Sequence, residues 1–208
     1  GEICLELETN CGNSPEVCLP VFIRPAPTPN AGPDVSVCKT SDQLNATRST
    51  GTNGQWTQVS GPGTSTFGDP ADPKSTISVN AFGKYKYVWS ESDRGCDGRD
   101  TVEYSFNEIP DKGQHSFICD ASNTKYKVTF RITGGIAPYT IIQGGGTIDP
   151  TSNTYTSADI LNNTPTLIII EDAKGCRFTF TSDNECKCNN LLGTIPDDIT
   201  HYCEDESF

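Results

Sequence analysis

Apolar and polar residues alternate one by one along most of this 208-residue sequence, and this pattern restricts the fold more than any other feature. A period of two places alternate side chains on opposite faces of a β-strand, one for a core and one for water. Glycine, proline, asparagine and aspartate cluster between the alternating runs, as at 30–34 and 61–63. The pattern predicts an all-β chain of antiparallel sandwiches. Its clearest core faces are Tyr85, Tyr87 and Trp89; Val102, Tyr104 and Phe106; Tyr126, Val128, Phe130 and Ile132; and Cys176, Phe178 and Phe180.

Ten cysteines are unusual for a chain of this length in a reducing compartment. Zinc is the alternative reading, but zinc sites favour CxxC pairs or short Cys/His sets. No CxxC occurs here, and His115 and His201 stand apart from such spacing. The cysteines therefore favour disulfides and an oxidising, extracellular location.

Two pairs of cysteines repeat with nearly the same spacing. Cys38 and Cys96 are 58 positions apart, and Cys119 and Cys176 are 57 apart. The second cysteine of each pair follows a glycine in a turn between two strand-like runs. We therefore expect two modules of one architecture, stapled by Cys38–Cys96 and Cys119–Cys176. In the entropic description, each closed loop restricts the unfolded chain by roughly 4 kcal/mol.

The two ends of the sequence read as parts of neighbouring modules. Residues 1–29 contain an alternating hairpin around the turn at 10–12, in which Cys4 and Cys18 share the outer face. A cross-strand Cys4–Cys18 bridge is therefore expected, whereas the partner of Cys11 is expected upstream of Gly1. Residues 186–208 read as the start of a following module, which would leave Cys203 to pair beyond Phe208. The complete modules are expected at 30–109 and 110–185.

Each expected module carries its own set of short motifs. The run Asn30-Ala31-Gly32-Pro33-Asp34, with Gly54-Gln55-Trp56 and Tyr87-Val88-Trp89 before Gly95-Cys96, resembles an immunoglobulin-like PKD-like module. The run Gly134-Gly135-Ile136-Ala137-Pro138-Tyr139, with Asp172-Ala173-Lys174-Gly175-Cys176, is similar to the SprB-type repeat of gliding adhesins. Both sets resemble modules of giant surface proteins of Bacteroidota, and this resemblance implies tandem immunoglobulin-like sandwiches. It also implies type IX secretion and a place on the cell surface or in a fibre.

Charge and hydropathy exclude several classes of partner. The formal net charge is −12, whereas binding to nucleic acid or to anionic lipid requires clustered lysine and arginine. No apolar run is long enough for a transmembrane helix. The expected partners are neighbouring modules of the same chain, further copies in a fibre, or a glycan or cell-surface ligand.

Several residues are candidates for binding or modification. The carboxylates of Asp69, Asp72, Asp93, Asp97 and Asp100 lie in turns and are candidate calcium ligands; solvated turn residues are the competing reading. Trp56 and Trp89 are candidate carbohydrate platforms, although a buried core role is favoured. Phe67 and Tyr139 lie beside turns and are expected at the surface. Asp100-Thr101-Val102 is similar to the O-glycosylation motif of Bacteroidota, with Thr101 as the acceptor.

No pattern of nucleophile, base or paired catalytic acids stands out. There is no GxSxG motif, and neither histidine has a recognisable local partner. We therefore expect a non-enzymatic structural segment of a surface fibre or adhesin stalk, with no cofactor other than calcium. The alternatives are a glycan- or cell-binding module and an accessory domain of a secreted hydrolase.

Overall fold

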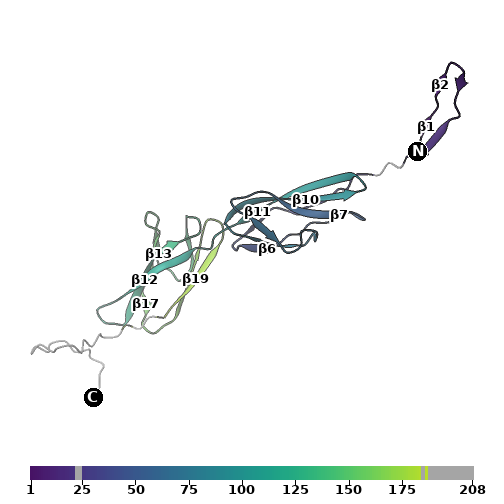
Figure 1. Ribbon diagram of the computed structural model, residues 1–208. Coiled ribbons are helices and arrows are strands. Elements are labelled where there is room, and N and C mark those ends of the chain that lie inside the picture. Colours follow the sequence, from purple (N-terminus) through teal and green to yellow (C-terminus); the bar gives the residue numbers. More distant parts are fainter. Residues whose placement is uncertain (22–24, 184–185, 187–208) are drawn as a thin grey trace, which may run out of the picture. The chain divides into compact units, whose positions relative to one another are not determined.

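The computed structural model describes residues 1–21, 25–183 and 186, and the described chain forms two compact units. The first unit runs from Gly1 to Phe106 and the second begins at Asn107. Each contains a β-sandwich with its own core (Figure 1). The described residues contain strands and no helix, which confirms the predicted all-β class. It follows that no described helix could cross a membrane.

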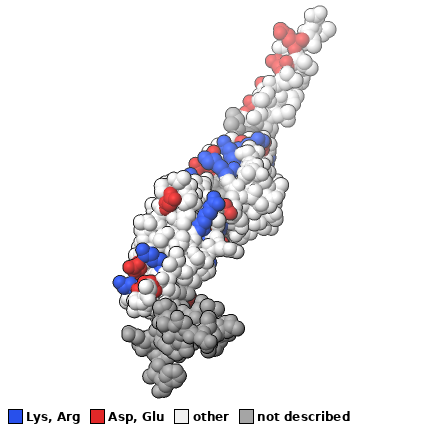
Figure 2. Space-filling view, turned by 90° about the vertical axis from the view of Figure 1, so that its left-hand side faces the viewer, with Lys and Arg blue, Asp and Glu red and all other residues white. Residues whose placement is uncertain are grey.

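The N-terminal hairpin is a two-stranded ribbon with one aliphatic face. In its main ladder Ile3 lies opposite Leu19, Leu5 opposite Val17, and Cys4 opposite Cys18 on the other face. Its aliphatic side chains, including Leu7, are 60–68% exposed. The ribbon contains four glutamates and no lysine or arginine, so the charged residues visible on it in Figure 2 are all acidic. Its strands are β1 (Glu2–Leu5), β2 (Glu8–Thr9), β3 (Gly12–Asn13) and β4 (Val17–Pro20).

The first sandwich pairs a four-stranded sheet with a three-stranded sheet. The larger sheet has the order β5-β11-β10-β7 and the smaller β6-β9-β8. The strand β5 is parallel to β11, whereas the other pairs are antiparallel. The strands are β5 (Val35–Val37), β6 (Ser41–Gln43), β7 (Asn53–Ser60), β8 (Ser65–Phe67), β9 (Thr76–Val79), β10 (Gly83–Asp93) and β11 (Cys96–Phe106).

Aromatic side chains from the larger sheet dominate the core of the first sandwich. Tyr85, Tyr87 and Trp89 of β10 are fully buried, as their alternation predicted. They pack against buried aliphatic residues of the opposite layer, among them Ile77 and Val79. Burial raises the pKa of Tyr87 to about 12, because an ionised phenolate in this core would lose its hydration.

The second sandwich has a different strand order. One sheet runs β12-β13-β16-β15, with β17 also pairing to β13, and the other runs β14-β18-β19. The predicted core face at 126–132 is buried in β13. The strands are β12 (Asp111–Cys119), β13 (Lys125–Thr133), β14 (Thr140–Gln143), β15 (Thr147–Asp149), β16 (Thr154–Thr156), β17 (Ile160–Leu161), β18 (Thr166–Glu171) and β19 (Arg177–Ser182).

The loop between β13 and β14 is held against the turn between β18 and β19. The buried carboxylate of Asp172 accepts hydrogen bonds from the backbone N–H groups of Ile136 (2.9 Å), Lys174 (2.8 Å) and Cys176 (2.8 Å). Gly134 and Gly135 both have φ near +63°, a conformation that favours glycine. The carboxylate and the two glycines therefore fix one end of the second sandwich.

Candidate functional site

The expected disulfide of the N-terminal hairpin is present. Cys4 and Cys18 are direct partners in the ladder, and their sulfurs are bonded at 2.05 Å. The bond lies on the face opposite the aliphatic side chains, as the alternation required. An isolated two-stranded hairpin is marginally stable in water, so this covalent bond supplies the restraint that the small ribbon lacks.

The predicted Cys38–Cys96 staple is wrong. Cys96 carries a free, half-exposed thiol, whereas Cys38 is disulfide-bonded to another partner. The reason is the parallel pairing of β5 with β11, which places Val37 opposite Phe106. Cys38 therefore lies beside the end of β11, and Cys96 is its first residue. At a rise of about 3.3 Å per residue, the two cysteines are roughly 30 Å apart.

The predicted Cys119–Cys176 staple is also wrong, because Cys119 is bonded to Cys186. Cys119 lies opposite Tyr126 at the start of β13, whereas Cys176 lies in the turn held near Ile136, beyond the end of β13. The length of β13 separates the predicted partners by roughly 25 Å. Cys176 forms a disulfide with a different partner.

Cys186 reaches Cys119 because β19 returns the chain to the start of β13. There the Tyr126 hydroxyl lies 2.9 Å from the Ser182 hydroxyl near the end of β19. Cys186 was expected to open a following module, but it is 7% exposed and belongs to the core of the second sandwich. The rest of the predicted segment 186–208, which is residues 187–208 and includes Cys203, lies outside the described residues.

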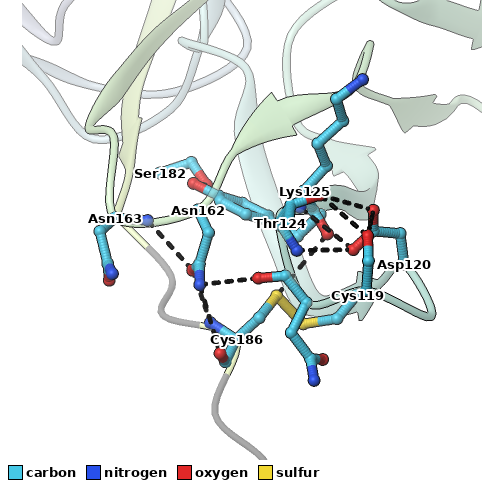
Figure 3. The surroundings of a disulfide bond; sticks show 11 residues. Cys119, Asp120, Thr124, Lys125, Asn162, Asn163, Ser182 and Cys186 are labelled. Atoms are coloured by element: carbon cyan, nitrogen blue, oxygen red, sulfur yellow. Dashed lines mark hydrogen bonds between the residues drawn. A yellow bond between two sulfur atoms is a disulfide. The ribbon is translucent and has the colours of Figure 1, made fainter. Parts of the chain in front are cut away.

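Asn162 fastens the backbone of Cys186 next to the disulfide (Figure 3). Its side-chain Oδ1 accepts a hydrogen bond of 2.7 Å from the Cys186 N–H, and its Nδ2 donates to the Cys186 carbonyl at 3.3 Å. The same Nδ2 donates to the Asn123 carbonyl at 2.9 Å. One amide therefore joins the β12–β13 turn, the segment after β17 and Cys186, which lies beyond the end of β19.

Asp120 organises the turn that follows Cys119. Its carboxylate accepts hydrogen bonds from the Ser122 hydroxyl (2.7 Å) and from the backbone N–H groups of Thr124 (2.8 Å) and Lys125 (3.1 Å). The hydroxyl of Ser122 and these backbone donors lower the pKa of Asp120 to about 2. The carboxylate is exposed, but it is fully occupied in shaping the turn beside the disulfide.

The five candidate calcium ligands do not come together. Asp69 and Asp72 cap their own turn by accepting from the N–H groups of Ala71 (2.9 Å) and Lys74 (2.8 Å). Asp100 accepts from the N–H of Ala31 at 2.8 Å. Asp93 and Asp97 belong to the β10–β11 hairpin. Within the described part of the chain, the single group of three or more candidate ligands is Glu2, Cys4 and Cys18, and both of its sulfurs are in a disulfide.

Sequence reasoning missed the buried carboxylate of Glu91. Its side chain accepts from the Trp89 indole N–H (2.7 Å), the Thr52 hydroxyl (3.0 Å) and the Ser49 N–H (3.1 Å). Burial raises the pKa of Glu91, but these donors together outweigh it, so that the pKa lies below its usual value. The signal was visible in the sequence, since Glu91 falls on the core face that continues from Trp89.

The aromatic candidates line cores instead of a binding surface. Trp56 and Trp89 are 1% and 0% exposed, with ring centroids 5.2 Å apart, so the core reading was right. Phe67 and Tyr139, expected at the surface, are partly buried against the two cores. These four side chains therefore pack within or against the two cores.

Two further candidates lie on exposed strand faces. His115 of β12 has its Nδ1 3.0 Å from the Lys112 ammonium, and its ring packs against Phe117 with centroids 5.0 Å apart. Its polar neighbour is thus a cation, whereas a catalytic histidine is oriented by a carboxylate or carbonyl. Thr101, the candidate glycosylation acceptor, is exposed on β11, so its modification stays a prediction.

Two shallow depressions lie on the surface of the described chain. One, of 190 Å³, lies beside the Cys119–Cys186 bond and is lined by Asp120 and Asp159 among others. Both carboxylates are engaged, Asp120 within its turn and Asp159 with Lys127 at 3.6 Å. The other, of 370 Å³, lies between the proline-rich segment 25–28 and the loop at 49–52. Neither presents a pair of free acids for catalysis.

Comparisons with known proteins identify the fold. A scan against protein-family models and a search of curated proteins each found no match. Among solved structures, the chain is similar to the N-terminal eight immunoglobulin domains of Down syndrome cell adhesion molecule, with a TM-score of 0.50 and 11% identity. That match covers 86% of this chain and 26% of the other, so the chain spans about a quarter of its length. With the two sandwiches described above, it shows a fold of tandem immunoglobulin-like domains carrying disulfides.

Two further solved structures have lower scores. A titin I-band fragment, I67–I69, matches at a TM-score of 0.44 with 10% identity, over 86% of this chain and 72% of its own. Extracellular domains 3–5 of Drosophila OTK match at 0.39 with 12% identity, over 81% of this chain and 63% of theirs.

Proposed function

We propose that this chain is a structural repeat segment of an extracellular surface fibre or adhesin stalk. The observation that carries the proposal is the direct pairing of the first and last strands of the first sandwich. Val35 and Val37 of β5 lie parallel to Tyr104 and Phe106 of β11. A chain that enters through β5 and leaves after β11 pulls these strands along each other, so their hydrogen bonds share the load.

Two carboxylates reinforce this connection. Asp100 accepts from the N–H of Ala31 at 2.8 Å, and Asp34 accepts from the N–H of Glu103 at 2.8 Å. Both bonds join the entry segment to β11, and hydrogen bonds to charged groups are stronger than neutral ones. Of the five aspartates that suggested calcium, Asp100 therefore supports a mechanical role.

We also propose the finer assignment to type IX-secreted surface proteins of Bacteroidota with PKD-like and SprB-type repeats. The motifs at 30–34 and 134–139 support it. Its test is the full-length reading frame in the source organism, which should encode many such modules and a C-terminal secretion domain. A catalytic domain in that frame would instead favour an accessory role beside a secreted hydrolase.

A domain exchange in the source organism tests the stalk function against binding. Residues 30–186 are replaced by an unrelated pair of immunoglobulin-like domains of similar length, and surface exposure and cell adhesion are measured. If the segment acts only as a stalk, the protein with the exchanged domains should keep both its surface exposure and its adhesion. Loss of adhesion with unchanged surface exposure would refute the stalk and favour a glycan- or cell-binding module.

A further inference from the structure

We propose that two copies of this chain associate through the aliphatic faces of their N-terminal ribbons (residues 1–21), packed face to face and antiparallel. The inference goes beyond the stalk function, because it names the surface through which two copies meet. On this face Ile3 lies opposite Leu19 and Leu5 opposite Val17, and these four side chains are 63–68% exposed. A contiguous aliphatic face of this kind on a soluble chain marks a surface that binds a partner.

The charges of the ribbon indicate which partner fits. The carboxylate of Glu2 lies within 4.8 Å of the sulfurs of Cys4 and Cys18, on the face opposite the aliphatic one. Alternation places Glu6 and Glu16 on the same side as these cysteines. A partner attracted by charge would therefore bind the disulfide face. The aliphatic face carries no charge and matches a second copy of itself, because a twofold pair brings identical surfaces together and leaves the carboxylates of both copies in water.

The area of the face is sufficient for a weak, specific dimer. Its five aliphatic side chains, with Leu7 included, leave roughly 500 Å² of apolar surface on each ribbon. Two ribbons packed face to face would bury about 1,000 Å² in total, near the lower limit of specific interfaces. The pair also forms two sheet layers around a common apolar interior, which a single two-stranded ribbon lacks. We expect a dissociation constant on the order of 100 µM.

The course of the chain favours the antiparallel arrangement. Each ribbon ends at Val21, and the chain then enters the first sandwich, which has two sheets of its own. Two packed sheet layers lie only about 10 Å apart, so parallel ribbons would bring two sandwiches to the same end of a narrow pair. Antiparallel ribbons place the sandwiches at opposite ends. The free thiol of Cys11, in the turn, then lies about 20 Å from the middle of the aliphatic face, so the two thiols of a pair are about 40 Å apart.

Sedimentation equilibrium of the full chain tests the association, with Cys11 and Cys96 alkylated so that no new disulfide links the copies. The wild type should dimerise reversibly. Leu5→Gln/Leu19→Gln should weaken the dimer by at least about 100-fold, because four leucines per pair lose their apolar contact. The matched control, Glu6→Gln/Glu16→Gln on the disulfide face, should dimerise at least as strongly as the wild type. A monomeric wild type, or equal association of the two variants, would overturn the inference.

The leucine variant cannot fail merely by unfolding the ribbon. Both leucines are exposed, and the Cys4–Cys18 bond keeps the two strands paired. Recovery of that disulfide peptide from the variant verifies the pairing. Raising the salt concentration should strengthen the wild-type dimer, because salt screens the repulsion between the glutamates of the two copies. Weaker association at higher salt would instead identify a charge-driven contact and refute the proposal.

Pulsed electron paramagnetic resonance tests the arrangement of the pair. A spin label is attached to Cys11 in the Cys96→Ser variant, so that each chain carries one label. An antiparallel pair should give a distance of about 40 Å between labels, whereas a distance below about 20 Å would overturn the antiparallel arrangement. The domain exchange described above leaves residues 1–29 in place and reports on adhesion. These measurements report on association, so failure of one proposal is distinguishable from failure of the other.

Discussion

The side chain of Asn162 pairs with the backbone of Cys186 as a neighbouring strand would, accepting from its N–H at 2.7 Å and donating to its carbonyl at 3.3 Å. Backbone groups buried without partners are costly, and a residue that leaves the last strand has no ladder to satisfy them. The single amide of Asn162 makes the two hydrogen bonds that a neighbouring strand would otherwise make with Cys186. It also reaches the Asn123 carbonyl, so its loss affects two segments.

Replacing Asn162 should destabilise the second sandwich. Asn162→Ala removes hydrogen bonds to Asn123 and Cys186, and we expect a loss of about 1–3 kcal/mol in the free energy of unfolding. Urea denaturation followed by circular dichroism measures it. The control is Asn163→Gly, because Asn163 is exposed with φ of 55°, which glycine adopts freely. Equal stability of the two variants would show that the amide contributes nothing.

Glu91 should make the first sandwich sensitive to acid. Its pKa in the folded protein lies below the usual 4.5, so its stabilisation is complete above that value. The stabilisation is lost as the pH falls through the lower folded pKa. Glu91→Gln should cost about 1.5–3 kcal/mol at neutral pH and flatten the fall in melting temperature in the acid range. Glu103→Gln, at a more exposed site, is the control; an unchanged acid profile in Glu91→Gln would contradict the prediction.

The proline-rich segment before the first sandwich should detach when Gly98 gains a side chain. A Cβ at Gly98 would lie 2.2 Å from the Pro27 carbonyl oxygen, so backbone must move. Gly98→Ala should therefore increase hydrogen exchange at Thr28, whose N–H donates to the Ser49 hydroxyl at 3.2 Å. Asp97→Ala, at an exposed neighbouring position, should leave exchange unchanged. Equal exchange in both variants would show that the segment does not depend on this contact.

Peptide mapping should recover the observed disulfides. Digestion without reduction, followed by mass spectrometry, is expected to yield Cys4 linked to Cys18 and Cys119 linked to Cys186. Iodoacetamide should label Cys11 readily, because it is exposed, and Cys96 more slowly. A peptide linking Cys119 to Cys176 would contradict the observed bond and restore the pairing expected from spacing.

Local patterns predicted much of the fold. Alternation identified the buried faces of β10, β11 and β13, because the side-chain period of a strand is a property of the backbone itself. The Cys4–Cys18 bond could also be predicted, since both cysteines belong to one hairpin whose register follows from its turn. The nearly equal spacing of Cys38–Cys96 and Cys119–Cys176 led us to expect two modules of one architecture, but the two sandwiches differ in strand order, and the spacing carried no information on which cysteines meet.

The sequence by itself determined the strands, their inward faces and the hairpin disulfide, because each depends on residues close together in the chain. Only the tertiary structure decided the bond between Cys119 and Cys186 and the buried contacts of Glu91. Those depend on which end of a sandwich each strand reaches and on which strand lies beside it. Strand direction and sheet order arise from packing between distant segments, so spacing along the chain could not supply them.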